Sequence, residues 1–474
     1  MSIKADICVI GGGSGGLSVA AGAAQMGQKV VLIEKGEMGG DCLNTGCVPS
    51  KALLSAAKHA HAFGHSEDFG IAPAAPQIDF AKTMAHVRGV IDAIAPIDSQ
   101  ERFEGLGVKV IRAHGRFTGP RTVEAGGETV EARYIVLATG STAAIPPIPG
   151  LDEVPYLTNE TLFQNTQRPD HLIVIGGGPI GLEMAQAHAR LGAKVTVLEA
   201  FKALSKDDPE LATIVLDAVR ADGVNIREGA SVLSVSEAAD GGVEVTIQDK
   251  GETRLIAGSH LLVATGRKPT VDGLDLDAAG VAYSPRGVTV DNRLRTTNKR
   301  VYAAGDVIGG RQFTHVAGYH AGIIVRNALF KVPAKNQDHL APWATYTDPE
   351  LAHVGITEAE AKEQHGDKVT VLRWEGHEND RAQAERRTES LIKVSVDKKG
   401  RPLGASIVAP HAGDLIQPWA MAMTSGLKMS DFTGHIAAYP TYSELSKRIG
   451  GAWYTPTLFS GKTRLLLKAL SVFG

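Results

Sequence analysis

The sequence predicts a mixed α/β protein in which two βαβ units of one pattern are followed by an α+β region. Glycine-rich turns follow short apolar strands at residues 11–16 and 176–181. Similar strand ends, Val-Leu-Ala-Thr-Gly at 136–140 and Leu-Val-Ala-Thr-Gly at 262–266, lie near the ends of the two units. From about residue 341 the pattern changes to alternating strands and two helices. At 474 residues the chain is too long for one hydrophobic core, and roughly 150 residues per domain predicts about three domains.

The first unit runs from an apolar strand at residues 6–10 through the glycine-rich turn and an alanine-rich helix to a strand that ends at Glu34. The first glycine of such a turn permits a tight bend, the second lets the backbone approach a pyrophosphate, and the third lets helix and strand pack closely. The helix N-terminus then binds phosphate, and the carboxylate accepts hydrogen bonds from a ribose. This pattern predicts a dinucleotide site.

The second unit repeats the first, with a strand at residues 172–175, the second glycine-rich turn, a helix, and a strand that ends at Glu199. In both units the acidic residue follows the first glycine by 23 positions. A single glycine-rich turn is weak evidence, whereas two copies with matched strands, helices and acids are strong. We therefore expect two dinucleotides.

Residues 39–51 contain Cys42 and Cys47, two of only three cysteines, directly before a helix-like run. The thiolate is the reactive form of cysteine, and the positive end of a helix lowers a thiol pKa. Lys51, four residues after Cys47 and on the same helical face, adds a full positive charge. The segment thus predicts a redox-active dithiol. Cys8 lies in an apolar strand, where we expect it to be buried and inert.

Together these strings resemble the pyridine-nucleotide-disulfide reductases, the flavoenzyme family of dihydrolipoyl dehydrogenase, glutathione reductase and mercuric reductase. The resemblance covers essentially the whole chain and implies two Rossmann-like dinucleotide-binding domains, for FAD and NAD, plus an α+β C-terminal dimerisation domain. The expected segments are the first part of the FAD-binding domain at 1–147, the NAD-binding domain at 148–270, the second part of the FAD-binding domain at 271–340, and the dimerisation domain with a C-terminal tail at 341–474.

The resemblance assigns FAD to the first copy, with Glu34 on the adenosine ribose. The segment at 301–307 looks like the family's second flavin-binding strand, whose aspartate contacts the ribityl chain. The residues expected to bind FAD are Gly11, Gly13, Ser14, Gly15, Gly16, Glu34, Lys35, Gly40, Asp41, Lys51, Thr139, Gly140 and Asp306.

The nicotinamide cofactor is assigned to the second copy. Its expected residues are Gly176, Gly178, Pro179, Ile180, Gly181, Glu199 and Gly266. Glu199 would accept a hydrogen bond from a free ribose 2′-hydroxyl and repel a 2′-phosphate, whereas NADP sites usually offer arginines there. The next three residues supply one lysine and no arginine. NADH is therefore favoured over NADPH.

The resemblance implies a relay in which hydride passes from nicotinamide to flavin and an electron pair passes from flavin to the disulfide. Cys47 is expected to lie against the flavin ring as the charge-transfer thiolate. Cys42 is expected to exchange with substrate, because exchange needs an accessible thiolate. Lys51 and Glu183 match the family's ion pair near the flavin N5.

One residue departs from the pattern of dihydrolipoyl dehydrogenase and glutathione reductase, in which a partner subunit supplies a His-Pro-Thr segment followed by a glutamate. Here Glu444 is present, but the histidine is Tyr439. Histidine titrates near pH 6.5 and tyrosine near about 10, so tyrosine is a poor general base at neutral pH. Slow turnover of dihydrolipoamide is therefore expected. His435 is an alternative base.

The predicted function is that of an FAD-dependent NAD(P)H:disulfide oxidoreductase, similar to dihydrolipoyl dehydrogenase, that acts as a homodimer on a small-molecule or protein-bound disulfide. One alternative is a mercuric-reductase-like or quinone-reducing enzyme. The Gly-Gly-Asp-Cys opening favours this alternative, but no cysteine follows Cys47 to pass on a soft metal. The other alternative is a flavin-bearing interaction protein that senses redox state.

Composition limits the remaining possibilities. A net charge of −3 gives no indication of a nucleic-acid partner, and no apolar stretch is long enough to span a bilayer. The cysteine content fits an intracellular enzyme, and a cytoplasmic location is expected. The histidines lack metal-ligand spacing with cysteines, so no metal site is predicted. The tail from Gly461, basic and leucine-rich, is expected either to pack on its own dimer or to bind a membrane surface or partner.

Overall fold

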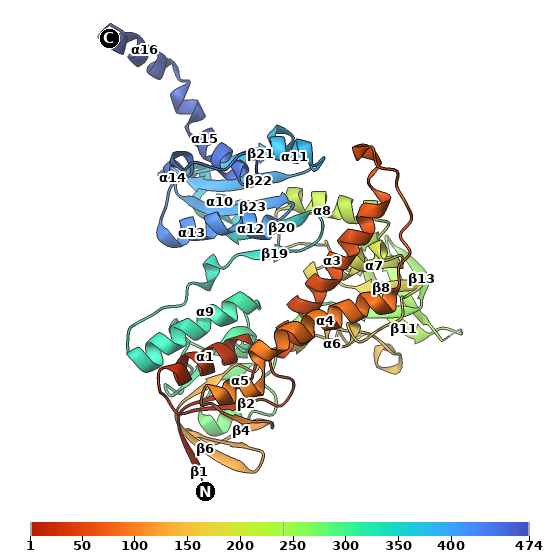
Figure 1. Ribbon diagram of the computed structural model, residues 1–474, viewed down its shortest axis with the longest axis vertical. Coiled ribbons are helices and arrows are strands. Elements are labelled where there is room, and N and C mark those ends of the chain that lie inside the picture. The colour runs from red at the N-terminus through yellow and green to blue at the C-terminus, as the bar shows by residue number, and fades with distance from the viewer. Residues whose placement is uncertain (1, 240, 473–474) are drawn as a thin grey trace. The chain divides into compact units, whose positions relative to one another are not determined.

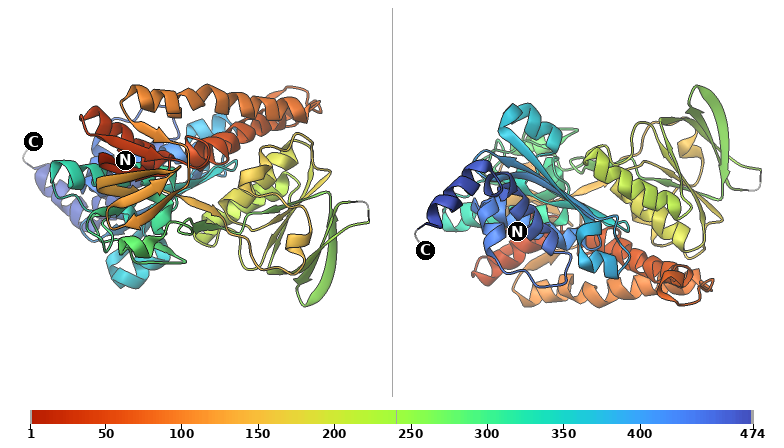
Figure 2. Two further views of the ribbon diagram at one scale, coloured as in Figure 1. Left: turned by 90° about the horizontal axis from the view of Figure 1, so that it is seen from below. Right: turned by 90° about the horizontal axis from the view of Figure 1, so that it is seen from above.

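The structure is a computed structural model that describes residues 2–239 and 241–472 (Figures 1 and 2). Its contacts divide the chain into two compact units. The first holds residues up to 201 together with 224–338, and the second holds 202–223 together with the residues from 339 on. The predicted α/β fold class is confirmed. The four predicted domain segments remain a prediction.

The first sheet of the first unit has seven strands in the order β3-β2-β1-β6-β5-β4, with β18 paired to β6. Its parallel part is formed by β1 (Ser2–Ile10), β2 (Val30–Ile33), β3 (Lys109–Ile111), β6 (Glu128–Leu137) and β18 (Val301–Ala303). The antiparallel strands β4 (Gly115–Gly119) and β5 (Thr122–Ala125) complete it. The chain thus returns to its first sheet at β18, after the whole second βαβ unit.

Strand β1 contains a continuous apolar run because both of its faces are buried. Ile7 and Val9 belong to one buried cluster and Cys8 and Ile10 to another, so both faces of the strand are covered. Such double burial is typical of parallel sheets. Helices α1 (Ser14–Gln25) and α9 (Thr314–Val325) pack against each other and contribute to the first of these clusters.

The second βαβ unit forms a four-stranded parallel sheet in the order β10-β9-β8-β14. Its strands are β8 (His171–Ile175), β9 (Lys194–Glu199), β10 (Asn225–Glu228) and β14 (His260–Val263), and helix α7 (Pro179–Arg190) joins β8 to β9. An antiparallel sheet follows, made of β11 (Ala230–Glu237), β12 (Val243–Asp249) and β13 (Glu252–Gly258). Strands β7 (Ser141–Ala143) and β15 (Arg267–Pro269) pair where the chain enters and leaves this region.

A helical hairpin carries the cysteine segment. Helix α2 (Gly40–Asn44) leads into α3 (Cys47–Gly64), which packs against both α4 (Phe80–Asp98) and α7. Short helices α5 (Gln100–Gly105) and α6 (Asn159–Leu162) complete this part of the unit. The packing of α3 on α7 places the cysteine helix directly beside the first helix of the second βαβ unit.

The second unit contains a five-stranded antiparallel sheet in the order β19-β20-β23-β22-β21. The strands are β19 (Trp343–Thr345), β20 (Glu350–Gly355), β21 (Val369–Glu375), β22 (Leu391–Asp397) and β23 (Pro402–Ala409). Its core includes fully buried Trp419, whose ring stacks on Phe432 at 3.9 Å between centroids.

The expectation of two helices beyond residue 341 was wrong. The described residues there form α10 (Glu358–His365), α11 (Asp380–Ala384), α12 (Ala412–Leu415), α13 (Gln417–Ser425), α14 (Met429–Gly434), α15 (Glu444–Leu458) and α16 (Gly461–Leu470). Several are only one or two turns long and end at glycines, as α13 does at Gly426 with φ of +70°. Helices this short show little of the periodicity that indicates a helix in a sequence.

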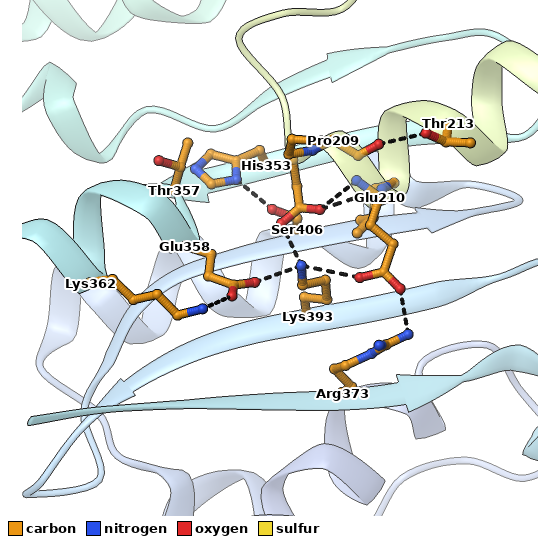
Figure 3. A network of polar contacts seen from close by, with 12 residues as sticks. Pro209, Glu210, Thr213, His353, Thr357, Glu358, Lys362, Arg373, Lys393 and Ser406 are labelled. Atoms are coloured by element: carbon orange, nitrogen blue, oxygen red, sulfur yellow. Dashed lines mark hydrogen bonds and ion pairs between the residues drawn. The ribbon is translucent and has the colours of Figure 1, made fainter. Parts of the chain in front are cut away.

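Helix α8 (Pro209–Ala221) lies in sequence between β9 and β10, yet it belongs to the second unit and contacts β20 and β23. The Lys393 ammonium on β22 explains this placement (Figure 3). It forms ion pairs with Asp208 at 2.7 Å, Glu210 at 3.3 Å and Glu358 at 2.6 Å, and its side chain is only 11% exposed. Because an enclosed charge is costly without partners, this cluster holds the start of α8 against the sheet.

Within residues 2–239 and 241–472, no helix combines the length and the apolar character that crossing a bilayer requires.

Candidate active site and cofactor sites

The two glycine-rich turns have the same geometry. Gly11 and Gly176 have φ of +111° and +115°, and a Cβ at either would lie 2.2 or 2.4 Å from a backbone carbonyl oxygen at a facing strand end. A Cβ at Gly16 or Gly181 would lie 1.9 or 2.0 Å from the carbonyl oxygen of the first glycine in the same turn. Both turns therefore require glycine at the bend and at the helix–strand contact.

Helices α1 and α7 both begin without a side-chain cap and without an acidic residue in the first turn. Their N-cap residues are Gly13 and Gly178, which have extended backbone conformations. The first N–H groups of each helix are therefore not satisfied by side chains and suit the pyrophosphate of a dinucleotide. The other predicted residues of these two turns lie in the first turn of the helix: Ser14, Gly15 and Gly16 in α1, and Pro179, Ile180 and Gly181 in α7.

The two acidic residues that end the second strands are held alike. Each carboxylate accepts one hydrogen bond from the N–H of the residue after the first glycine, Gly12 for Glu34 and Gly177 for Glu199, and another from the N–H two positions after itself. For Glu199 these distances are 2.8 and 2.9 Å, and for Glu34 the second is 2.6 Å. The backbone thus fixes each carboxylate, and its oxygens keep further lone pairs for the hydroxyls of a ribose.

Five further predicted positions lie around the turns. A Cβ at Gly40 would lie 2.7 Å from the Cα of Gly13, so the cysteine segment passes close to the first turn. Thr139 donates from its Oγ1 to the carbonyl oxygen of Thr270 at 2.7 Å. Gly140 and Gly266 have φ of +68° and +129° at the ends of the matched strands. Lys35 is exposed after Glu34.

Asp306 stands at the centre of a polar cluster in the first unit. Ser141 donates to its Oδ2 at 2.5 Å, and the Arg267 guanidinium lies 3.7 Å from the same oxygen. Arg267 is also 3.2 Å from the Oδ1 of Asp41 and is only 12% exposed. Burial raises the pKa of Asp306, while the Ser141 hydrogen bond and the Arg267 charge oppose this rise. Two residues predicted to bind FAD, Asp41 and Asp306, are therefore joined by an arginine.

The two cysteines lie at adjoining helix ends, with Cys42 inside α2 and Cys47 as the first residue of α3. Cys42 is half-buried, whereas Cys47 is exposed, so the expectation that Cys42 is the more accessible sulfur is not met. The pKa of Cys47 is lowered to about 6, mainly by a hydrogen bond from Cys42, with further contributions from Thr314 and the Lys51 charge. The pKa of Cys42 is raised by the same hydrogen bond and by burial. In the dithiol form, Cys47 is the thiolate and Cys42 carries the proton.

The predicted ion pair is formed. The Nζ of Lys51 lies 2.8 Å from the Oε2 of Glu183, whose side chain is only 6% exposed. Lys51 is on α3 and Glu183 is on α7, so the pair connects the cysteine helix with the helix that follows the second glycine-rich turn.

Tyr439 and Glu444 lie in the second unit. The Tyr439 side chain is 66% exposed, and its hydroxyl donates to the Oδ2 of Asp380 at 2.7 Å. This hydrogen bond to a carboxylate raises the pKa of Tyr439. Glu444 begins α15 and lies 3.8 Å from Arg448. His435 is exposed in the loop before Tyr439.

Sequence reasoning missed three residues of these sites. Thr314 starts α9, and its hydroxyl lies 3.5 Å from the Sγ of Cys47 across 267 positions of sequence. Arg267 directly follows the Leu-Val-Ala-Thr-Gly strand end at 262–266, and this position could have marked it as a residue of the site. Asp380 lies in a polar segment, and nothing in that segment predicted its contact with Tyr439. Within the described ranges, no group of three or more His, Cys, Asp or Glu side chains is placed to hold a metal ion.

Comparison with known proteins agrees with this geometry. The model of the pyridine nucleotide-disulphide oxidoreductase family matches residues 5–321, and the model of that family's dimerisation domain matches 341–448. The mercuric reductase of Bacillus cereus is 36% identical over 444 residues, which are 93% of this chain and 70% of that protein. The dihydrolipoyl dehydrogenase of Bacillus subtilis (strain 168) is 33% identical over 447 residues, 92% of this chain and 96% of that protein.

A solved structure is also similar, that of the HOCl-induced flavoprotein disulfide reductase RclA from Escherichia coli. Its TM-score is 0.83 at 29% identity, and the match covers 94% of this chain and 99% of that one.

The chain belongs to the pyridine nucleotide-disulphide oxidoreductase family. It is a flavoprotein oxidoreductase that acts on sulfur groups and uses FAD and NAD(P)H. The dimerisation domain supports a homodimer. Both uncapped helix ends and both fixed carboxylates fit these two dinucleotides.

Replacing Lys51 by Met is expected to raise the pKa of Cys47. The ammonium stabilises the thiolate, so its loss moves this pKa from about 6 toward the ordinary thiol value. The reduced holoenzyme should then be alkylated at Cys47 more slowly near pH 6 to 7. Mass spectrometry of the alkylated peptides over a pH series measures the alkylation rate of Cys47 separately from that of Cys42.

The matched control is Lys58→Met, which removes an exposed lysine from the same helix. An unchanged pH midpoint in Lys51→Met would show that the lysine charge does not set the Cys47 pKa.

Proposed function

We propose that the protein is an NADH-linked disulfide oxidoreductase, similar to dihydrolipoyl dehydrogenase, in which Cys42 and Cys47 form the redox-active disulfide. The observation that carries this proposal is the unequal pair of sulfurs. The pKa of Cys47 is lowered to about 6 and that of Cys42 is raised, so one sulfur can remain a thiolate while the other receives a proton. This asymmetry suits successive exchange reactions rather than a structural disulfide.

When bound, FAD reduced by NADH would supply the electron pair that opens the disulfide. The Thr314 hydroxyl and the Lys51 ammonium then stabilise the Cys47 thiolate. Cys42 passes its proton along the hydrogen bond to Cys47 and attacks one sulfur of the substrate disulfide, whose S–S bond breaks. The leaving thiolate takes the proton from Cys47 and departs as the first thiol. Cys47, again a thiolate, attacks the Cys42 sulfur in the mixed disulfide and re-forms the Cys42–Cys47 bond. The second product leaves as a thiolate and takes a proton from solvent.

The preference for NADH rests on Glu199. Two backbone N–H groups, at 2.8 and 2.9 Å, hold its carboxylate at the end of β9. A carboxylate held in place accepts a ribose 2′-hydroxyl and disfavours a 2′-phosphate.

The proposed roles of the sulfurs are tested by Cys47→Ser and Cys42→Ser. Both variants are expected to keep FAD, because the glycine-rich turn, Glu34 and Asp306 bind it, and both should lose disulfide reduction. Only Cys42→Ser should keep the long-wavelength absorbance of a thiolate beside the flavin. Reduction of a quinone by NADH should largely survive in both. Disulfide reduction retained by either variant would contradict the assignment.

A second candidate function is reduction of a soft metal ion or a quinone. Mercuric reductases are among the relatives, and one solved structure is a Cu(II) complex of RclA. The observation that favours this candidate is Tyr439. Its hydrogen bond to Asp380 raises its pKa further, so it is a still poorer proton acceptor at neutral pH. A metal ion or a quinone can accept electrons without proton transfer to or from a thiol, so its reduction does not need a general base at this position.

Replacement of Tyr439 by His separates the two candidates. If proton transfer limits dithiol turnover, the wild type should oxidise dihydrolipoamide slowly, and the variant should do so roughly tenfold faster. General-base catalysis commonly supplies a rate increase of about 10²- to 10⁴-fold, of which the introduced histidine is expected to recover a part. Its rate should also depend on pH near the histidine pKa, about 6.5.

The control is Tyr439→Phe, which removes the hydroxyl without adding a base and should bring no gain. A fast wild type, or equal rates in the His and Phe variants, would place the base elsewhere or make it unnecessary.

A further inference from the structure

A polar cavity lies in the first unit, apart from the sites described above. It has a volume of about 250 Å³, and none of the glycine-turn or cysteine residues lines it. Two buried tyrosines form its floor, Tyr134 on β6 and Tyr302 on β18, with ring centroids 5.9 Å apart and the rings edge to face. Because both rings belong to the main buried cluster of the first sheet, this floor is rigid.

The rim of the cavity is strongly basic. Arg293, Arg295, Lys299 and Lys331 line it, and no carboxylate does. The nearest acid in these contacts is Asp291, which lies 2.9 Å from Arg295 and 4.0 Å from Lys299. In the described part of the chain, Arg293 forms no ion pair.

Further positive charge lies around the Tyr134 ring. Arg133 and Arg300 place their guanidinium carbons 5.4 and 5.7 Å from its centroid, and the Lys331 ammonium lies 4.5 Å from it. Lys331 also donates to the Tyr134 hydroxyl at 2.6 Å and holds the pKa of that phenol below its usual value. Six basic residues thus gather here, and Asp291 pairs with two of them, Arg295 and Lys299. An added anion would relieve the repulsion among these positive charges.

We propose that this cavity binds a compact oligophosphate of the size of inorganic pyrophosphate. Arginine guanidinium groups and lysine ammonium groups approach from the loop 291–299 and from Lys331, and such groups are the preferred partners of phosphate oxygens. The Asn327 side chain adds a neutral polar group to the wall. Pockets for larger organic ligands commonly exceed about 300 Å³, so a free oligophosphate fits better than one carried by a nucleoside.

The site has a structural consequence for the flavin-binding region. Tyr302 lies on β18, and the strand continues through a tight turn to Asp306. The basic residues that would hold the anion come before β18 in the sequence, at 293–299, and after it, at Lys331. A bound anion would therefore stabilise the position of the strand that leads to Asp306. Binding is therefore expected to raise the melting temperature of the FAD holoenzyme.

The test is isothermal titration of inorganic pyrophosphate into the FAD holoenzyme, in low-salt buffer with saturating NAD⁺ to fill the second dinucleotide site. The site variant is Arg293→Gln/Lys299→Gln. The matched control is Lys82→Gln/Arg88→Gln, which removes the same charge from two highly exposed side chains of α4. Arg293→Lys is a conservative variant that keeps the charge.

The wild type, the control and Arg293→Lys are expected to bind pyrophosphate with similar affinity, whereas the site variant should bind at least about tenfold more weakly. Disulfide reductase activity without pyrophosphate should be unchanged in all of them, which also shows that they are folded. Citrate and ADP should bind more weakly than pyrophosphate. The proposal is overturned if the wild type shows no saturable binding, if the site and control variants weaken equally, or if citrate or ADP binds as tightly.

Discussion

The ion pair between Lys51 and Glu183 is the contact on which the arrangement of the first unit depends. Glu183 is almost fully enclosed on α7, and a buried carboxylate is stable only with a positive partner. That partner comes from α3, the helix whose first residue is Cys47. One interaction therefore fixes the cysteine helix against the second βαβ unit and places a positive charge near the thiolate. The Lys51 charge thereby adds to the lowering of the Cys47 pKa, which comes mainly from the hydrogen bond with Cys42.

In both βαβ units, a few glycines and one acidic residue produce the same local geometry for a dinucleotide. In each unit a Cβ at the first or third glycine would lie within 2.4 Å of a backbone oxygen, and the acid is held by the same two N–H groups. The helices that follow have no acid in their first turn and no side-chain cap. What differs is the surroundings. The first turn adjoins the cysteine segment through Gly40, and its sheet also receives β18 and the segment of Asp306.

Much of this could be predicted because it is encoded locally. The glycine turns, the acids at strand ends and the cysteines before a helix all lie within short windows of sequence, and family resemblance supplied the Lys51–Glu183 pair. Thr314 and Arg267 could not be found in this way, because each meets its partner only after the chain has returned from another sheet. The placement of α8 was also missed, since its reason is a single lysine on β22 that gathers three carboxylates. The contact of Tyr439 with Asp380 likewise depends on tertiary structure.

The proposed function depends on electron exchange between the bound flavin and the pair Cys42 and Cys47. It is tested most directly by anaerobic titration of the FAD holoenzyme with NADH, with free thiols counted by alkylation and mass spectrometry at each step. We expect uptake of a second electron pair beyond the pair that reduces the flavin, together with new alkylation at Cys42 and Cys47 and none at Cys8. Uptake that stops once the flavin is reduced, with no new thiol at either position, would contradict it.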